Sequence, residues 1–169
     1  MIATVGIRAR FATELTTMGT TRPTRTPNPP RTARGRLLVV SDDVGVRRVI
    51  SAILQAAGFS VWKACDGVAG VEKYRSHWPD LAFVDVEMPS KDGLEVIREI
   101  RAEFPAARLI SMSGAATVKG VDTLRAARDA GALGFLPKPI TVDGVLATVG
   151  IGLHVPSDAF VDLGACVPM

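Results

Sequence analysis

The chain has 169 residues, and 47% of them are apolar, which is enough to bury the core of one domain. No apolar run reaches the roughly 18 residues of a membrane-spanning helix, and Arg8 and Arg10 interrupt the first apolar stretch, so a secretory signal is not expected either. Seven arginines and one glutamate give residues 1–36 a charge of +6, which leaves −3 of the total +3 for residues 37–169. The total charge therefore gives no argument that the domain binds nucleic acid.

Residues 1–35 are predicted to form a disordered tail. Residues 19–35 contain four prolines and no large apolar residue, so they cannot bury enough surface to offset the entropy of ordering. Three interpretations of the tail stay open: a plain extension, a start codon placed too far upstream with Met18 as the internal candidate, and an arginine-rich targeting or anion-binding arm.

From residue 36 onward, short apolar strands alternate with segments of helical periodicity. The predicted elements in chain order are a strand at 36–40, a helix at 46–57, a strand at 61–62, a helix at 67–77, a strand at 81–84, a helix at 94–104, a strand at 109–110, a helix that includes Val121 and ends at Gly131, a strand at 134–136 and a helix at 142–149. Asp92 and Thr141 are the predicted N-caps of the third and fifth helices. Five such βα units predict a parallel sheet with helices on both faces. The folded domain is expected to span residues 36–153, with residues 154–169 as a C-terminal tail.

Polar residues follow four of the five predicted strands, at the points where these strands end. They are Ser41, Asp42 and Asp43 after the first strand, Asp85 after the third, Ser113 after the fourth and Lys138 after the fifth. Ligands of an open parallel α/β sheet bind outside the carboxyl ends of its strands, so these side chains are expected to converge.

This set of residue types favours phosphoryl transfer. Clustered carboxylates call for a cation, and a few hard oxygen ligands with open positions suit Mg²⁺. A carboxylate can itself act as a nucleophile and form an aspartyl-phosphate. Lys138 and Ser113 can then supply charge and a hydrogen bond to the transferring group.

Four segments resemble the receiver domains of response regulators in two-component signalling. Residues 85–93, DVEMPSKDG, resemble the family's DxxMPxxDG segment, and residues 131–139, GALGFLPKP, resemble its GAxGFxxKP segment. Residues 38–43, LVVSDD, resemble its acidic first-strand end, and residues 111–114, SMSG, resemble the end of its fourth strand. The matches run in order from about residue 36 to residue 153.

The resemblance implies a flavodoxin-like (βα)5 fold with strand order 2-1-3-4-5, as in the chemotaxis receiver. It implies that Asp85 is the phosphoacceptor, and that Mg²⁺ is held by the carboxylates of Asp42 and Asp85 and the backbone carbonyl of Glu87, with Asp43 as a further candidate ligand. Lys138 would pair with the acceptor through a cis Lys138–Pro139 peptide. Ser113 and Phe135 would be the switch residues. The alternatives without a functional role are that Asp42 and Asp43 only cap the first helix and that Lys138 is an ordinary surface lysine.

Two stretches depart from the family pattern. An ungapped match puts Ser41 where the family has the first of two acids, which predicts weaker Mg²⁺ binding. A shift of one residue would restore an acidic pair but needs a compensating gap before Arg47. The stretch before the fourth helix is also longer than usual, so residues 115–120 are expected to form an extended loop.

The resulting hypothesis is a stand-alone, cytoplasmic response regulator that catalyses its own Mg²⁺-dependent phosphorylation and dephosphorylation but acts mainly as a switch. The two cysteines lack metal-ligand spacing, which fits reduced thiols in the cytoplasm. Neither His77 nor His154 looks like a phosphodonor, so a sensor histidine kinase or a histidine phosphotransfer protein would be the donor.

The output would be a target protein that contacts the face formed by helix 4, strand 5 and helix 5. No DNA-binding pattern and no membrane association are expected, and a homodimer is left open. The alternative is a receiver-like adaptor that binds proteins without being phosphorylated, for which Ser41 is the best support.

Overall fold

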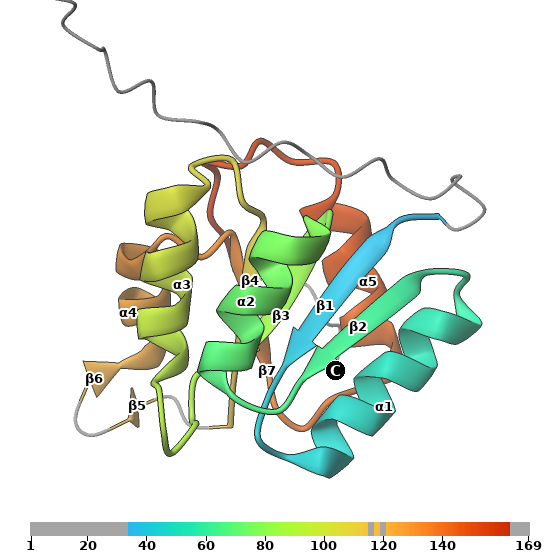
Figure 1. The fold of residues 1–169 in the computed structure, drawn as a ribbon, viewed down its shortest axis with the longest axis horizontal. Coiled ribbons are helices and arrows are strands. Elements are labelled where there is room, and N and C mark those ends of the chain that lie inside the picture. Colours follow the sequence, from blue (N-terminus) through green and yellow to red (C-terminus); the bar gives the residue numbers. More distant parts are fainter. Residues whose placement is uncertain (1–33, 115–116, 119–120, 163–169) are drawn as a thin grey trace, which may run out of the picture. The chain divides into compact units, whose positions relative to one another are not determined.

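The centre of the structure is a parallel sheet (Figure 1). The computed structural model describes residues 34–114, 117–118 and 121–162, which all belong to one compact unit, Arg31–Met169. The strands run in the order β2-β1-β3-β4-β7-β8. Since β7 is the fifth strand of the predicted sheet, the predicted order 2-1-3-4-5 is confirmed. The strands are β1 (Arg36–Val40), β2 (Ser60–Ala64), β3 (Leu81–Asp85), β4 (Leu109–Ser113), β7 (Gly134–Pro137) and β8 (Val161–Asp162).

Helices cover both faces of this sheet, as two separate apolar clusters show. One cluster contains Leu54 of α1 and Val149 of α5, and the other contains Tyr74 of α2, Ile100 of α3 and Ala127 of α4. The sheet is therefore doubly wound, with α1 and α5 on one face and α2, α3 and α4 on the other. The helices are α1 (Val44–Ala56), α2 (Gly67–His77), α3 (Gly93–Glu103), α4 (Thr123–Ala130) and α5 (Val142–Gly152).

The first strand illustrates why these runs must be apolar throughout. Successive side chains of a strand point to opposite faces of the sheet. Leu37 and Val39 accordingly belong to the cluster with α1 and α5, whereas Leu38 and Val40 belong to the other cluster. All four are at most 1% exposed. Burial of each such side chain contributes about 1.5–3 kcal/mol, so a strand covered on both faces selects a continuous apolar run.

Capping side chains mark where the helices begin. Asp92 Oδ1 accepts a hydrogen bond from Leu94 N at 2.9 Å, and Thr141 Oγ1 accepts one from Gly144 N at 3.1 Å, so both predicted N-caps are confirmed. Each bond satisfies a backbone N–H that has no partner inside its own helix.

The stretch before α4 differs from the predicted loop. It contains a short antiparallel pair, β5 (Thr117–Val118) and β6 (Val121–Asp122), whereas residues 115–116 and 119–120 lie outside the described residues. The prediction that Val121 lies on the fourth helix is wrong. The helix begins at Thr123 because Asp122 caps it, accepting a hydrogen bond from Arg125 N at 3.1 Å.

The segment after α5 also contains more structure than the predicted tail. Its strand β8 pairs in parallel with Gly134 and Phe135 of β7, and Val161 N donates to Leu133 O at 2.8 Å. Val161 also packs against the apolar cluster of α1 and α5. Residue 153 therefore closes α5 but does not end the folded part of the chain, since a strand of two residues is too short to show a period.

Two further expectations concern the ends of the chain and the membrane. The predicted disordered tail falls on residues 1–35, of which residues 1–33 lie outside the described residues. In the described ranges, no helix has the length and apolar character needed to cross a membrane.

Candidate functional site

Asp85 lies at the end of β3, in the crevice that the strand order creates. Strand β1 has β2 on one side and β3 on the other, so the chain leaves the carboxyl ends of β1 and β3 in opposite directions. Asp85 as a whole residue is 0% exposed. A buried carboxylate is stable only where charges or hydrogen bonds compensate it, so its partners define the site.

Lys138 is the charge partner of Asp85. Its Nζ donates to Asp85 Oδ1 at 2.9 Å and to Asp85 Oδ2 at 2.8 Å. The lysine follows β7, and its backbone N donates to Ser113 O at 2.9 Å. The Lys138–Pro139 peptide is cis, as the resemblance implied. The structure therefore brings the ends of β3, β4 and β7 to one point.

Ser41 is the second partner of Asp85, and sequence reasoning did not predict this contact. Its Oγ donates to Asp85 Oδ2 at 2.6 Å, and Ser41 is 0% exposed. The serine follows β1, and the sheet pairs Val40 with Val84, which puts the next residue of each strand side by side. Strand order and register would have been the signal, because they make residue 41 a neighbour of residue 85.

These contacts occupy the whole acceptor capacity of Asp85. Oδ1 accepts from Lys138 Nζ and from Glu87 N, the latter at 3.3 Å, while Oδ2 accepts from Lys138 Nζ and Ser41 Oγ. A carboxylate offers about four lone-pair positions. Any further ligand of Asp85 must therefore displace one of its present donors.

Asp43 serves as the N-cap of α1. Its Oδ1 accepts from Gly45 N at 2.6 Å and from Val46 N at 3.1 Å. These backbone bonds, supported by the positive charges of Lys138 and Arg47, hold the pKa of Asp43 below its ordinary value. Among the described residues, no group of three or more histidine, cysteine, aspartate or glutamate side chains is placed to hold a metal ion. Asp43 thus acts as a helix cap through Oδ1, and its role as a further metal ligand stays a prediction.

The remaining predicted Mg²⁺ ligands fit a metal in part. Asp42 is exposed, and its carboxylate has no hydrogen bond or ion pair with another described residue. The carbonyl of Glu87 likewise accepts no backbone hydrogen bond in the described part of the chain. Both are oxygen donors of the kind that Mg²⁺ prefers. The third donor, Asp85, could join them only by losing one of its present bonds from Lys138, Ser41 or Glu87 N.

The two predicted switch residues lie on neighbouring strands. Ser113 is the last residue of β4, is 1% exposed, and its Oγ donates to Glu87 Oε1 at 3.4 Å. Phe135 is half-buried in β7, where it pairs with Ser111 on one side and with Asp162 of β8 on the other. Their switching roles stay predictions.

Gly93 explains why the segment after Asp85 can fold back so tightly. A Cβ at position 93 would lie 1.9 Å from the backbone O of Asp85 and 2.8 Å from Cα of Val86. Gly93 N also donates to Val86 O at 3.2 Å. Only glycine allows this approach of backbone to backbone, which positions the loop beneath the acceptor residue.

Comparison with known proteins is consistent with this geometry. The family model described as the response regulator receiver domain matches residues 37–150. Chemotaxis protein CheY of Bacillus subtilis is 37% identical over 121 residues, which are 70% of this chain and 98% of CheY. A protein-glutamate methylesterase/protein-glutamine glutaminase of Oleidesulfovibrio alaskensis is 36% identical over 108 residues, which are 63% of this chain but only 29% of that protein.

Solved structures show the same fold. Chemotaxis response regulator CheY4 of Vibrio cholerae superposes with a TM-score of 0.62 at 26% identity, covering 68% of this chain and 95% of that one. NtrX of Brucella abortus superposes with a TM-score of 0.65 at 26% identity, covering 71% of this chain and 27% of that one. This chain therefore belongs to the response regulator receiver domain family.

Proposed function

We propose that this receiver domain accepts a phosphoryl group on Asp85, in two-component or phosphorelay signalling. The observation that carries the proposal is the buried Asp85 carboxylate, held by Lys138 Nζ at 2.8 and 2.9 Å. An ion pair that only stabilised the fold would not need to lie at the carboxyl end of the central strand, where ligands bind. At that edge, however, the exposed Asp42 follows β1 and Ser113 ends β4, the two strands that flank β3.

The proposed donor is a phosphohistidine on a sensor histidine kinase or a histidine phosphotransfer protein. The chain's own histidines in the described region are poor candidates. His77 Nδ1 lies 3.1 Å from Lys73 O, and His154 Nδ1 lies 2.6 Å from Gly150 O. Both are thus engaged by helix carbonyls, away from the ends of β1 and β3.

The side chains of the site can perform the transfer with few changes. An Asp85 oxygen attacks phosphorus, a P–O bond forms, the P–N bond to the donor imidazole breaks, and the imidazole leaves with the electron pair of that bond. The carboxylate is already ionised, so no general base is needed. Lys138 can follow the negative charge from the carboxylate to the phosphoryl oxygens, and Ser113 can donate to them. Mg²⁺ bound by Asp42, Asp85 and the Glu87 carbonyl would supply further neutralising charge.

The phosphoacceptor role predicts that Asp85→Asn abolishes phosphorylation. The chain is incubated with a small phosphodonor and Mg²⁺, and its intact mass is measured. The wild type should gain one phosphoryl group and the Asn variant none, because an amide oxygen is not a competent nucleophile here. Asp129→Asn, an exposed change on α4, is the matched control and should be phosphorylated like the wild type. Equal labelling of Asp85→Asn and wild type would contradict the proposal.

A second candidate function is an adaptor that binds partners without phosphorylation. The filled acceptor positions of Asp85 favour it, since Ser41 occupies one of them. The same mass experiment separates the two functions. A wild-type chain that gains no phosphoryl group from any small donor, at any Mg²⁺ concentration, would support the adaptor.

The contact between Ser41 and Asp85 predicts weak Mg²⁺ binding that Ser41→Asp strengthens. A second buried carboxylate cannot donate to Asp85, repels it, and adds a charge that a cation relieves. We expect the variant to be less stable than wild type without Mg²⁺ and to bind Mg²⁺ about tenfold tighter or better, since each factor of ten corresponds to about 1.4 kcal/mol. Calorimetric titration and thermal melting with and without Mg²⁺ measure both effects.

Ser41→Ala is the control for that prediction, because it removes the hydroxyl donor without adding charge. It should strengthen Mg²⁺ binding less than Ser41→Asp does. Unchanged or weaker Mg²⁺ affinity in Ser41→Asp would show that Ser41 does not limit metal binding.

The proposed output surface is the face formed by α4, β7 and α5, which a target protein or a second copy of the chain would contact. In this structure β8 pairs with the edge of β7 at Gly134 and Phe135. Arg128 of α4 lies over the ring of Phe160, 5.6 Å from its centroid, and so fastens the same segment. A partner at this face would therefore meet the β8 segment as well as the helices.

A further inference from the structure

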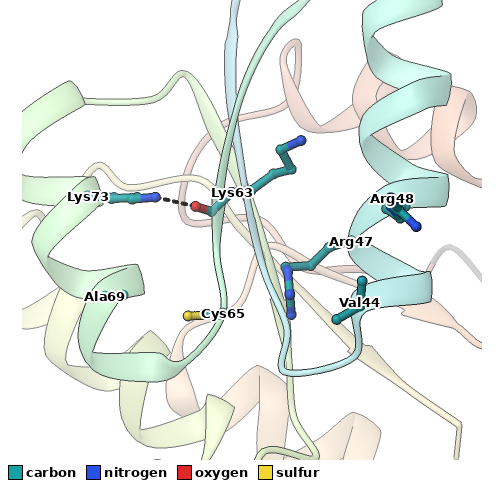
Figure 2. A pocket seen from close by; sticks show the side chains of 7 residues that line it. All are labelled: Val44, Arg47, Arg48, Lys63, Cys65, Ala69 and Lys73. Atoms are coloured by element: carbon teal, nitrogen blue, oxygen red, sulfur yellow. Dashed lines mark hydrogen bonds between the residues drawn. The ribbon is translucent and has the colours of Figure 1, made fainter.

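A basic pocket lies beside edge strand β2, between α1 and α2 (Figure 2). Its volume is about 360 Å³. Four of the side chains that line it are cations, and none is acidic: Arg47 and Arg48 come from α1, Lys63 from β2 and Lys73 from α2. Residues 37–169 carry a net charge of −3, so this concentration of positive charge runs against the character of the domain.

In the described part of the chain the pocket cations lack carboxylate partners, as Arg98 and Arg128 also do, whereas five other cations have them. Ion pairs within 4.0 Å link Arg36, Arg75, Lys91, Arg125 and Lys138 to aspartate or glutamate. In the described part of the chain, none of the four pocket cations makes such a pair. Their positive charges are therefore left to solvent or to a ligand.

Backbone carbonyls, rather than acids, orient two of these cations. Arg47 Nη1 donates to Ser41 O, and Lys73 Nζ donates to Lys63 O, the bond drawn in Figure 2. A bond to a neutral carbonyl fixes the side chain without cancelling its charge. Arg47 and Lys73 are thus partly preorganised at the pocket, which lowers the entropy cost of binding an anion.

Two acids near the pocket in sequence, Asp43 and Asp66, are committed to helix caps, and the exposed Glu72 beside Lys73 makes no ion pair with a described residue. Asp43 accepts from the first N–H groups of α1, and Asp66 Oδ1 accepts from Ala69 N of α2 at 2.8 Å. Guarding the unpaired edge of β2 against strand addition is a simpler role for such cations. It accounts for Lys63 and for the Lys73 bond to the strand, but not for the two arginines on α1.

We propose that this pocket binds a small polyanion that carries two or more linked phosphate groups. Guanidinium groups bind phosphate oxygens in pairs, and ammonium groups add charge at a point. The volume falls at the lower end of the range of about 300–1,000 Å³ that is typical of small-molecule sites. The pocket also includes Cys65, just after β2, so it lies at the carboxyl end of a strand, where ligands of doubly wound folds bind.

Cys65 provides a reporter for the test. It is an exposed free thiol that lines the pocket, and Cys166 is the only other cysteine of the chain. In the full chain with Cys166→Ser, we would measure alkylation of Cys65 by neutral iodoacetamide while pyrophosphate is added at constant ionic strength. Pyrophosphate should slow alkylation in a saturable manner, and calorimetry should give the same dissociation constant. Inorganic phosphate should bind more weakly.

Two double variants test where the anion binds. Arg48→Gln with Lys63→Gln removes two pocket cations and should weaken pyrophosphate binding about tenfold or more, because charge-assisted hydrogen bonds are lost. Arg98→Gln with Arg125→Gln removes two exposed cations from α3 and α4 and should leave the affinity unchanged. Urea unfolding of each variant checks that the fold is intact. A nucleoside triphosphate, compared with pyrophosphate, shows whether a nucleoside adds affinity.

Three results would overturn the proposal. These are alkylation that pyrophosphate does not slow, an equal loss of affinity in both double variants, and protection of Cys65 by an acidic peptide but not by pyrophosphate. The last result would make the pocket a protein-contact surface. Repeating the titration with Asp85→Asn keeps this test independent of the phosphoacceptor role, since the pocket cations do not contact that carboxylate.

Discussion

Gly93→Ala is expected to lower the free energy of unfolding by about 3 kcal/mol or more, near the upper end for overpacking. The added Cβ would lie 1.9 Å from the backbone O of Asp85 and 2.7 Å from its carbonyl carbon. Backbone atoms cannot move aside as the end of a flexible side chain can. The loop that follows Asp85 must therefore shift, and the Asp85 carboxylate should shift with it. Urea unfolding measures the loss of stability, and the mass experiment measures the accompanying loss of phosphorylation.

Gly150→Ala is the matched control, because Gly150 lies inside α5 and a Cβ there meets nothing within 4 Å. The same change should raise the free energy of unfolding by about 0.5–1 kcal/mol, since alanine restricts the unfolded chain and favours helix. The signs are opposite because the favourable effect of alanine is realised where a Cβ has space and is outweighed where the Cβ meets backbone atoms. Equal tolerance of both substitutions would show that the chain at residues 85–93 does not approach itself as closely as described.

Lys138→Met is expected to destabilise the fold by about 3 kcal/mol, because it leaves the Asp85 carboxylate buried without its counter-charge. The lysine side chain is 20% exposed and the aspartate side chain 1% exposed, so solvent can replace little of the lost interaction. Ser41 and Glu87 N would remain as donors, but both are neutral. Methionine keeps the approximate length and the apolar stem of the lysine side chain, so the loss of stability measures the effect of removing the charge. Urea unfolding at neutral pH gives the value.

The double variant Lys138→Met with Asp85→Asn provides the control. Removing the negative charge as well should recover much of the lost stability, since no uncompensated charge then stays buried. Phosphorylation should be lost in Lys138→Met, in Asp85→Asn and in the double variant. A double variant as unstable as Lys138→Met alone would attribute the loss to packing of the lysine stem and not to the ion pair.

Much of the fold could be predicted from local sequence. The strand at Leu37–Val40 is apolar throughout because both faces of the sheet are covered, and that run is visible without a structure. Asp92 and Thr141 could be assigned as caps because a capping side chain bonds a backbone N–H only two or three residues ahead. In contrast, the spacing of Val121 predicts a helix, whereas its backbone pairing with Val118 of β5 makes it a strand residue.

Some contacts of the candidate site could likewise be predicted from the sequence, and others could not. Asp85 and Lys138 could be brought together in prediction because two motifs resemble known segments, and the structure places their charged atoms 2.8 and 2.9 Å apart. The cap role of Asp43 is also predictable, because it depends on backbone N–H groups two and three residues ahead, and the structure shows both bonds. The bond from Ser41 to Asp85 was not foreseen, since it depends on the register of β1 against β3.

By itself, the sequence determined the five main strands and the five helices, where several helices begin, and which residue types stand at the strand ends. Those properties depend on periodicity and on contacts between residues a few positions apart. Only the tertiary structure decided that Ser41 fills an acceptor position of Asp85, that β8 adds to the sheet, and that four cations share one pocket. Each of these depends on pairing between distant segments, which the order and register of the strands set and no local pattern records.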